Sequence, residues 1–467
     1  MSEEIKQWVE QTENATCETG YGSPRISSEC PDCALPLTFD SYSYCSMGCM
    51  YCFAYFSKAN NPAMKGMKLR STNPANLTPK NKKTYEYFYK HRFVLHIGGL
   101  ADPFCGFEKK FGVGYKMLEY LSKEKYPTLF STKGPTLLNK KYLQLFDKSS
   151  KNLNYAFQFS ITTADDKLAK IVEPLVPSPT NRIKMIKTLS GMGYWTILRL
   201  RPYLMGITDV TIMELLQKCK DAGIKGVSME FLCLDMRASE EAKRRYGEIG
   251  RVSGFGDVDY FDYYKKLSPS KRGGYLRLNR DVKESYVKQV YKWCQENDIL
   301  YCSSDPDYKE LSQSDCCCAL PTEYPQNPEM VNYNHYQVTS TIREARKLYW
   351  SSTSSSDHLE PPHQIHFEDV YPSHMGSDKT IGFLEENAFS YDHPSIVSFS
   401  MGKRKALTLR GIFQASWNNL QSPSNPYNYF DGKLKPVDRD PNGNLIFEYV
   451  PSAYEYEWAK EGIDLTL

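Results

Sequence analysis

The sequence predicts an α/β fold built around a parallel sheet or barrel. Between residues 37 and about 305, short apolar runs that resemble strands alternate with helical patterns. This alternation is typical of βα units, and six or seven such units are present. The chain has 467 residues, whereas a barrel-type domain takes about 200 to 250 residues. We therefore expect one large domain with extensions.

The expected strands end at a common face, because parallel strands of a barrel point in the same direction. We expect strands at 37–44, 93–97, 128–132, 155–161, 194–200, 226–231 and 299–302. The helices between them are expected at 78–90, 114–123, 139–146, 180–189, 211–221 and 282–296. Polar side chains at the strand ends should therefore surround one cavity.

The expected organisation has three parts. Residues 1–36 form an N-terminal extension that contains Cys17, Cys30 and Cys33. Residues 37–320 form the core barrel, with an insertion at 235–281, and residues 321–467 form a Tyr-rich C-terminal accessory region. In that region Asp440-Pro-Asn-Gly-Asn, flanked by apolar residues, predicts a hairpin turn.

The charge, the apolar patterning and the cysteine content of the chain indicate its partners and its compartment. The net charge of +3 is nearly balanced, so no global field indicates nucleic acid or an anionic membrane as partner. The first residues lack the basic start and apolar core of a signal peptide, and no stretch is long enough to span a bilayer. We expect a soluble, cytoplasmic protein without a membrane partner. Its 14 cysteines would be mostly reduced, so clustered cysteines indicate metal or redox chemistry.

One cluster stands out directly after the first expected strand, in Cys45-Ser-Met-Gly-Cys49-Met-Tyr-Cys52. A loop this short, at about 3.3 to 3.6 Å per residue, can wrap three thiols around one small inorganic centre but leaves one coordination position open. Three thiolates on a four-iron cluster leave the fourth iron for an outside ligand, which suits chemistry. A competing interpretation is a zinc ribbon of Cys30, Cys33, Cys49 and Cys52, which leaves Cys45 unused.

The spacing Cys-x3-Cys-x2-Cys, with Tyr51 before the last cysteine, resembles the signature of radical S-adenosylmethionine (SAM) enzymes. The resemblance implies a [4Fe-4S] cluster held by Cys45, Cys49 and Cys52, whose open iron binds SAM. An electron then cleaves SAM to methionine and a 5'-deoxyadenosyl radical that abstracts hydrogen from a substrate. It also implies a partial (β/α)6 TIM-type barrel, which six or seven units suit, and an electron donor such as flavodoxin or ferredoxin.

Further motifs are similar to the spore photoproduct lyase-like branch of this family, over roughly residues 37–320. They are Asp102-Pro-Phe with Glu108, Ser131-Thr-Lys133-Gly-Pro, and Glu173-Pro-Leu followed by Arg182. The resemblance favours a nucleic acid or nucleotide as substrate, with a peptide or small metabolite next. The lyase repairs a thymine dimer with a hydrogen-donating cysteine at the end of the second strand. Here Cys105 is the nearest thiol, either as catalytic hydrogen donor or as a packing residue.

The resemblance also implies SAM contacts at the barrel mouth. Gly98 and Gly99 allow the backbone to approach a ligand closely. The family has a Gly-Gly-acidic motif there that binds the SAM amino group; the third position here is Leu100, and Asp102 is the nearest acid. Ser160 and Arg199 stand where the family contacts the ribose and carboxylate of SAM. A simple turn, or residues that only brace the barrel, are the alternatives.

Other charged residues at the strand ends have less specific interpretations. Arg201 and Glu230 are candidates to pair with each other, because a buried charge needs a partner. Lys133 is either a site residue or a solvated loop residue. The insertion interleaves basic and aromatic residues, which can grip nucleic acid, but acids are mixed in, and an exposed helix face or a lid is the alternative.

A second metal site or cluster is the other expectation from the cysteines. Its candidate ligands are Cys302 and Cys316-Cys317-Cys318, or Cys30 and Cys33. Adjacent side chains in an extended segment point to opposite sides, so two of the three consecutive cysteines can share an ion more readily than all three. The alternative to an enzyme is a zinc-binding module that recognises nucleic acid or a partner protein.

Overall fold

The computed structural model of the chain divides into two compact units. The first comprises Met1–Arg25, Leu37–Ile299 and Tyr324–Val331, and the second comprises Ile26–Pro36, Leu300–Glu323 and Asn332–Leu467. The structure describes residues 3–19, 25–26, 35, 37–56, 68–71, 94–134, 136–151, 153–256, 258–268, 271–272, 275–314, 316–321, 338–353, 364–366, 432–439, 441 and 445–467. Within these ranges, no helix combines the length and the apolar character needed to cross a membrane.

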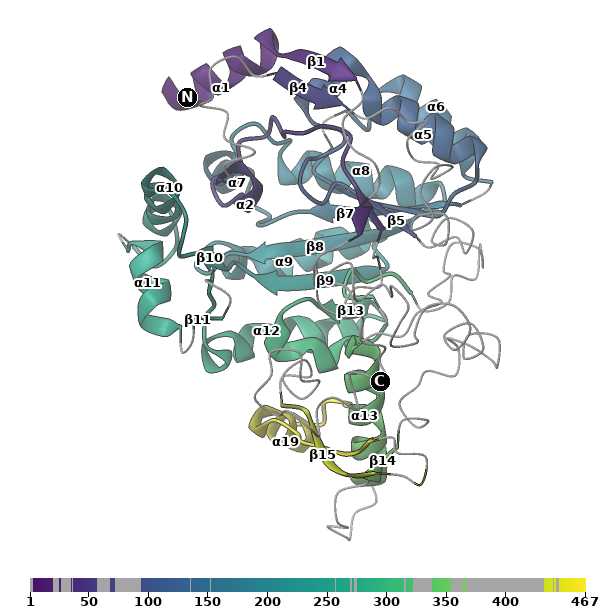
Figure 1. Ribbon diagram of the computed structural model, residues 1–467, viewed down its shortest axis with the longest axis vertical. Helices are drawn as coiled ribbons and strands as arrows, with labels where there is room; N and C mark the ends of the chain where they lie inside the picture. Colours follow the sequence, from purple (N-terminus) through teal and green to yellow (C-terminus); the bar gives the residue numbers. More distant parts are fainter. Residues whose placement is uncertain are drawn as a thin grey trace. The chain divides into compact units, whose positions relative to one another are not determined.

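The first unit contains a run of six parallel strands in chain order (Figure 1). They are β3 (Leu37–Phe39), β5 (Leu95–Ile97), β6 (Thr128–Thr132), β7 (Tyr155–Ser160), β8 (Trp195–Tyr203) and β9 (Gly226–Phe231), each paired in parallel with the next. Every side chain of β6 and β7 is buried, as expected for strands covered on both faces. The predicted α/β fold of the barrel type is confirmed.

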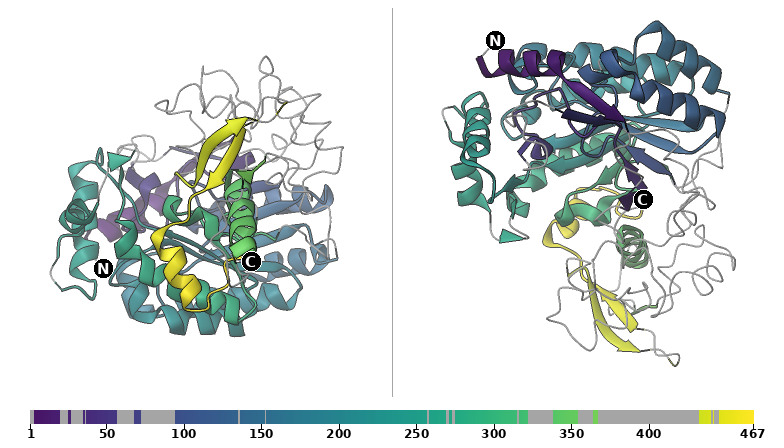
Figure 2. Two further views of the ribbon diagram at one scale, coloured as in Figure 1. Left: turned by 90° about the horizontal axis from the view of Figure 1, so that it is seen from below. Right: turned by 45° about the horizontal axis from the view of Figure 1, so that its top comes forward.

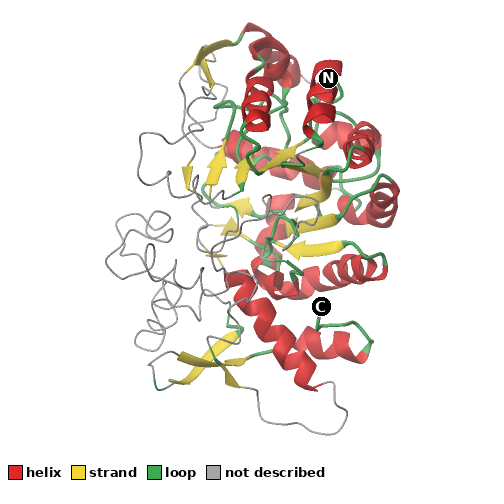
Figure 3. Cartoon of the chain, turned by 90° about the vertical axis from the view of Figure 1, so that its right-hand side faces the viewer, coloured by secondary structure: helices red, strands yellow, loops and turns green. Residues whose placement is uncertain are grey.

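Helices connect the strands and lie along one side of the sheet (Figure 3). Side-chain oxygens of Asn139, Asp165 and Ser178 accept hydrogen bonds from the first turns of three of them, which fixes where those helices begin. The predicted helix at 78–90 lies outside the described residues, and the other five are confirmed. The connecting helices are α4 (Gly106–Phe111), α5 (Val113–Lys123), α6 (Lys140–Ser149), α7 (Asp166–Val172), α8 (Pro179–Gly191), α9 (Thr208–Asp221) and α12 (Arg280–Glu296).

Aromatic rings fill the space between the sheet and its helices. Phe130 on β6 stacks on Phe157 of β7, with ring centroids 5.5 Å apart. Phe146 of α6 meets Phe157 edge to face at 5.3 Å, and Tyr194 meets the same ring at 5.5 Å. Such pairs contribute about 0.5 to 1.5 kcal/mol each beyond the burial of their area. This core holds the strand ends in a fixed arrangement.

The insertion is a folded subdomain of the first unit. It contains α10 (Glu240–Arg251), α11 (Tyr260–Leu267) and an antiparallel sheet of β10 (Leu234–Asp235), β11 (Lys271–Arg272) and β12 (Tyr275–Leu276). Both views of Figure 2 show the two helices side by side. Figure 1 shows them at the side of the sheet where β9 leads into β10, which is the carboxyl end of the strands.

The N-terminal segment adds α1 (Glu3–Asn14) and β1 (Thr16–Thr19), which pairs in parallel with β4 (Lys68–Ser71). A short helix, α2 (Phe53–Phe56), follows the cysteine loop. The sequence predicted none of these elements.

The second unit contains the predicted strand at 299–302 as β13 (Leu300–Ser303) and a 3-10 helix, η3 (Pro306–Leu311). It continues with α13 (Val338–Thr353), an antiparallel sheet of β14 (Gln364–Ile365), β16 (Leu445–Tyr449) and β15 (Leu434–Arg439), and α19 (Ala453–Lys460). The buried ammonium of Lys433 lies 2.8 Å from Glu310 and 2.6 Å from Glu455. β15 and β16 flank the predicted hairpin turn.

Candidate active site

The three cysteines follow the carboxyl end of β3 in one loop. Cys49 is buried, and Cys45 and Cys52 are half-buried. Burial raises the pKa of the Cys49 thiol, the ammonium of Lys133 acts in the opposite direction, and the charges of Glu173, Cys52 and Cys45 add to the rise. One short loop therefore carries all three thiols, and none of the three residues is fully exposed.

Three thiols on one loop are a donor set that an iron-sulfur cluster with one open iron would use. Among the described residues, no group of three or more His, Cys, Asp and Glu side chains is arranged to hold one metal ion. In a [4Fe-4S] cluster each thiolate binds a different iron, so the sulfurs surround a larger centre. Cys30 and Cys33, which the zinc-ribbon interpretation needs, lie outside the described residues.

Cys105 contacts the cysteine loop. It is fully buried at the start of α4, and its thiol forms a hydrogen bond with Cys45. This hydrogen bond, followed by burial, raises the pKa of Cys45. The next residue also contacts the loop, because the Gly106 N–H donates to Ser46 Oγ at 2.7 Å. The sequence indicated Cys105 as a hydrogen donor or a packing residue, but it gave no sign of the contact with Cys45.

Gly98 forms a tight turn after β5, between the ends of β3 and β6. Its φ is +97°, and its N–H donates to the Phe39 carbonyl at 3.2 Å. A Cβ at this position would lie 2.2 Å from the Ser131 carbonyl oxygen on β6. Only glycine fits at this position, so the backbone of Gly98 passes directly against the end of β6.

Two carboxylates hold this turn. Asp40 Oδ1, just after β3, accepts the N–H groups of Leu100 at 2.9 Å and Ala101 at 3.1 Å. Asp40 directly follows β3, which is shorter than the predicted strand at 37–44 and ends at residue 39. The sequence analysis did not single out Asp40; an acid at a strand end, opposite a Gly-Gly turn, was the only available signal.

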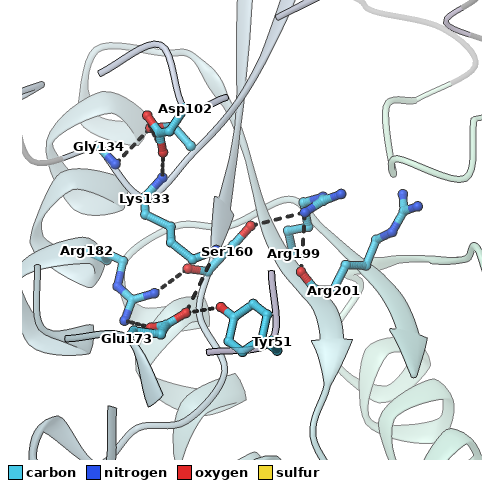
Figure 4. Close-up of polar contacts among 10 residues, drawn as sticks. Tyr51, Asp102, Lys133, Gly134, Ser160, Glu173, Arg182, Arg199 and Arg201 are labelled. Atoms are coloured by element: carbon cyan, nitrogen blue, oxygen red, sulfur yellow. Dashed lines mark hydrogen bonds and ion pairs between the residues drawn. The ribbon is translucent and has the colours of Figure 1, made fainter. Parts of the chain in front are cut away.

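Asp102 is the second of these carboxylates. It accepts the Thr132 hydroxyl at 2.9 Å, the Phe104 N–H at 2.8 Å and the Lys133 N–H at 2.5 Å. Burial raises the pKa of this carboxyl, and the backbone N–H groups of Lys133 and Phe104 oppose the rise. The side chain thus ties the turn after β5 to the end of β6 (Figure 4).

Ser160 and Arg199 lie side by side, because they are partners in the register of β7 and β8. Arg199 Nη1 donates to Ser160 Oγ at 3.3 Å and to the Arg201 carbonyl at 3.3 Å (Figure 4). The predicted pair of Arg201 and Glu230 is confirmed, with Arg201 Nη2 2.8 Å from Glu230 Oε2. Arg277 of the insertion lies 3.6 Å from the other oxygen of Glu230.

A buried network centred on Glu173 anchors the cysteine loop (Figure 4). The Tyr51 hydroxyl, between two of the cysteines, donates to Glu173 Oε1, and Arg182 Nη2 donates to Oε2 at 2.5 Å. Arg182 Nη1 also donates to the Ser160 carbonyl at 2.5 Å. Beside the Tyr51 contact, the Met50 N–H donates to the Val172 carbonyl at 3.0 Å. A side-chain tie and a backbone tie therefore attach the loop to the end of α7.

The remaining cysteines of the predicted second metal site lie in the second unit. Cys302 Sγ is 3.2 Å from Ser314 Oγ, and burial raises the pKa of Cys302 to about 11. Cys316 and Cys318 are buried and Cys317 is half-buried. The second metal site stays a prediction, and its alternative ligands, Cys30 and Cys33, are not among the described residues.

No family model matches the chain. The uncharacterized protein Rv2578c of Mycobacterium tuberculosis and the uncharacterized protein Mb2609c of Mycobacterium bovis are each 25% identical to it over 238 residues. These alignments cover 47% of this chain and 68% of each relative.

Solved structures of spore photoproduct lyase and of SuiB are similar to the chain. A variant of spore photoproduct lyase matches with a TM-score of 0.48 and 16% identity, over 64% of this chain and 85% of that one. Another variant, with bound AdoMet and dinucleoside spore photoproduct, has a TM-score of 0.47 and 15% identity, over the same shares. Streptococcus suis SuiB bound to S-adenosylmethionine has a TM-score of 0.36 and 17% identity, over 60% of this chain and 54% of that one.

Proposed function

We propose that the protein is a radical SAM enzyme, with Cys45, Cys49 and Cys52 holding a [4Fe-4S] cluster that receives SAM on its open iron. The observation that carries the proposal is that Cys45, Cys49 and Cys52 share one short loop after β3, which Tyr51 and Met50 attach to the end of α7. When bound, the reduced cluster cleaves SAM to methionine and a 5'-deoxyadenosyl radical that abstracts hydrogen from the substrate. A flavodoxin or ferredoxin would supply the electron.

Residues at neighbouring strand ends would hold SAM. The backbone carbonyls of Gly98 and Gly99, which are both half-buried after β5, would accept hydrogen bonds from its amino group, with Asp102 holding the turn in place. Arg199 would bind the SAM carboxylate, since a guanidinium pairs well with a carboxylate, and Ser160 would bind the ribose. The hydrogen bond between Arg199 and Ser160 brings the two side chains together, which supports this assignment.

The leading substrate class is a nucleic acid or nucleotide, followed by a peptide or small metabolite. The lyase-like motifs support this order, together with the insertion at 235–281, where eleven basic residues outnumber eight acidic ones. Comparing the nucleosides and peptides of cells with and without the protein would identify the substrate. A modification found in nucleosides supports the first class, and one found only in peptides contradicts it.

Cys105 would return a hydrogen atom to the substrate radical. Its S–H bond would break homolytically, leaving a thiyl radical that regains a hydrogen atom from 5'-deoxyadenosine, or one electron and one proton from the donor. Its contact with Cys45 supports this role. In cells that carry Cys105→Ala, the modification should disappear while the purified variant still releases 5'-deoxyadenosine. A variant that still produces the modification would assign Cys105 a packing role.

The central test is cluster content. Anaerobically reconstituted protein should be brown, contain about four irons per chain, and release 5'-deoxyadenosine on reduction with SAM. Cys45→Ala should lose both properties. Cys219→Ala is the matched control, because Cys219 is buried in α9 and takes no part in the loop. A colourless, zinc-containing protein that is indifferent to Cys45→Ala would instead support the zinc module.

A further inference from the structure

Lys133, which follows β6, is fixed at both of its ends. Its N–H donates to Asp102 Oδ2 at 2.5 Å, and its ammonium lies 3.8 Å from Glu173 Oε1 and 5.6 Å from the centre of the Tyr51 ring. The side chain is only 13% exposed. Of the two interpretations from the sequence, the solvated loop residue is therefore wrong, because Glu173 and Tyr51 hold the ammonium away from solvent.

The Tyr51 ring connects this ammonium to the cluster loop. Tyr51 lies between Cys49 and Cys52 in the sequence, and its side chain is buried. Figure 4 shows its ring and the Lys133 side chain converging on Glu173. A cation within about 6 Å of an aromatic centroid is attracted to the face of the ring. The ammonium is therefore held beside the loop by an ion pair and by a ring that belongs to the loop.

The charges of the network do not cancel. Arg182 and Glu173 are fully buried and form a direct ion pair at 2.5 Å, so each offsets the other. Lys133 is a second cation on the same carboxylate, at the longer distance of 3.8 Å. Glu173, Arg182 and Lys133 together carry one positive charge, and the buried carboxyl of Asp102, which accepts the Lys133 N–H, is present in every variant compared below. Charges with so little exposure are weakly screened by water and salt.

We propose that Lys133 is a positioning residue that raises the reduction potential of the cluster bound by Cys45, Cys49 and Cys52, with Glu173 and Tyr51 fixing its ammonium. The inference rests on the proposed function. A cluster becomes more negative when it accepts an electron, and a fixed positive charge nearby stabilises that reduced state. Local charge is one of the factors that set the potentials of iron-sulfur clusters.

The network predicts two separable effects. Lys133 acts through charge, so its neutral replacement should change the potential and leave the loop anchored by Tyr51 and Met50. Tyr51 is neutral and acts through its hydroxyl, so Tyr51→Phe should loosen the loop without changing the charge. Potential and cluster retention should therefore respond to different substitutions.

The first measurement is an anaerobic redox titration of the reconstituted full chain in the absence of SAM, monitored by electron paramagnetic resonance, which gives the midpoint potential. The second is the iron content before and after exposure to a chelator, which measures how firmly the cluster is retained. Lys133→Met should keep its iron and show a lower midpoint potential than wild type, and Lys133→Arg should restore the potential. Tyr51→Phe should keep the wild-type potential and lose iron faster to the chelator. Lys148→Met, at an exposed position on α6, is the control and should change neither quantity.

Two outcomes would overturn the inference, and they are distinguishable. If Lys133→Met binds iron and its midpoint potential is unchanged, the inference about Lys133 is wrong, but the proposed function stands. If the same variant also loses affinity for SAM, Lys133 is instead a SAM contact. If wild-type protein binds no cluster at all, the proposed function fails together with the inference.

Discussion

Replacing Gly98 by alanine tests the turn on which the candidate site depends. The new Cβ would lie 2.2 Å from the Ser131 carbonyl oxygen, whereas a carbon-oxygen contact needs about 3.3 Å. The oxygen must move by about 1 Å, although its strand pairs with β5 on one side and β7 on the other. Overpacking of this kind costs about 1 to 3 kcal/mol, and an L-residue in a left-handed conformation costs about 1 to 2 kcal/mol. Gly98→Ala should thus destabilise the protein by about 2 to 5 kcal/mol.

Gly112→Ala separates the two contributions. Gly112 also has a positive φ, of 64°, but a Cβ there would meet no atom within 4 Å. It should therefore cost only the conformational part, about 1 to 2 kcal/mol. Urea unfolding of the metal-free protein, followed by circular dichroism, measures both variants through the shift of the midpoint. If Gly98→Ala costs no more than Gly112→Ala, the close approach to β6 is wrong.

The remaining predictions concern buried charges. Lys433→Met should destabilise the second unit by about 3 to 5 kcal/mol in the same urea assay, because the carboxylates of Glu310 and Glu455 would lose the cation between them. Lys460→Met, at an exposed position, should stay within about 0.5 kcal/mol, and equal effects would refute the role of the network. In the first unit, burial favours a higher pKa for Glu173, but the guanidinium and ammonium beside it prevail and lower the pKa. Since its folded pKa lies below the unfolded value of about 4.3, its contribution is present above that pH and is lost as the pH falls through the folded value. Wild type should therefore lose more stability than Glu173→Gln across this acid range, and parallel curves would contradict the assignment.

Local patterns in the sequence were sufficient to predict most strands of the parallel sheet. The strands at 128–132 and 226–231 have the predicted bounds, because short runs with large apolar residues between helical segments mark the buried strands of a parallel sheet. The pairing of residues 16–19 with residues 68–71 could not be predicted in this way, because neither segment has such a pattern in the sequence. These strands are short and polar, and about fifty residues separate them, so only the folded chain shows their register. The strand from residue 195 also continues to Tyr203, through a charged segment that a search for apolar runs stops before.

The same distinction between local and long-range interactions explains which residues of the candidate site could be predicted. Cysteines, paired glycines and strand-end arginines could be identified because each residue type has few structural uses in such positions. The residues that anchor these segments could not be identified from the sequence, because their partners are distant in the chain. The Tyr51 hydroxyl donates to a carboxylate 122 residues away, and Asp40 accepts N–H groups about 60 residues away. Glu173 and Glu108 were quoted for their resemblance to a family, without a physical role. Glu108 accepts the hydroxyls of two buried tyrosines and the N–H groups that open α5, and Glu173 neutralises a buried arginine and fixes the cysteine loop. These acids shape the segments that carry the thiols, so a site of this kind depends on buried pairs that a search for reactive residues passes over.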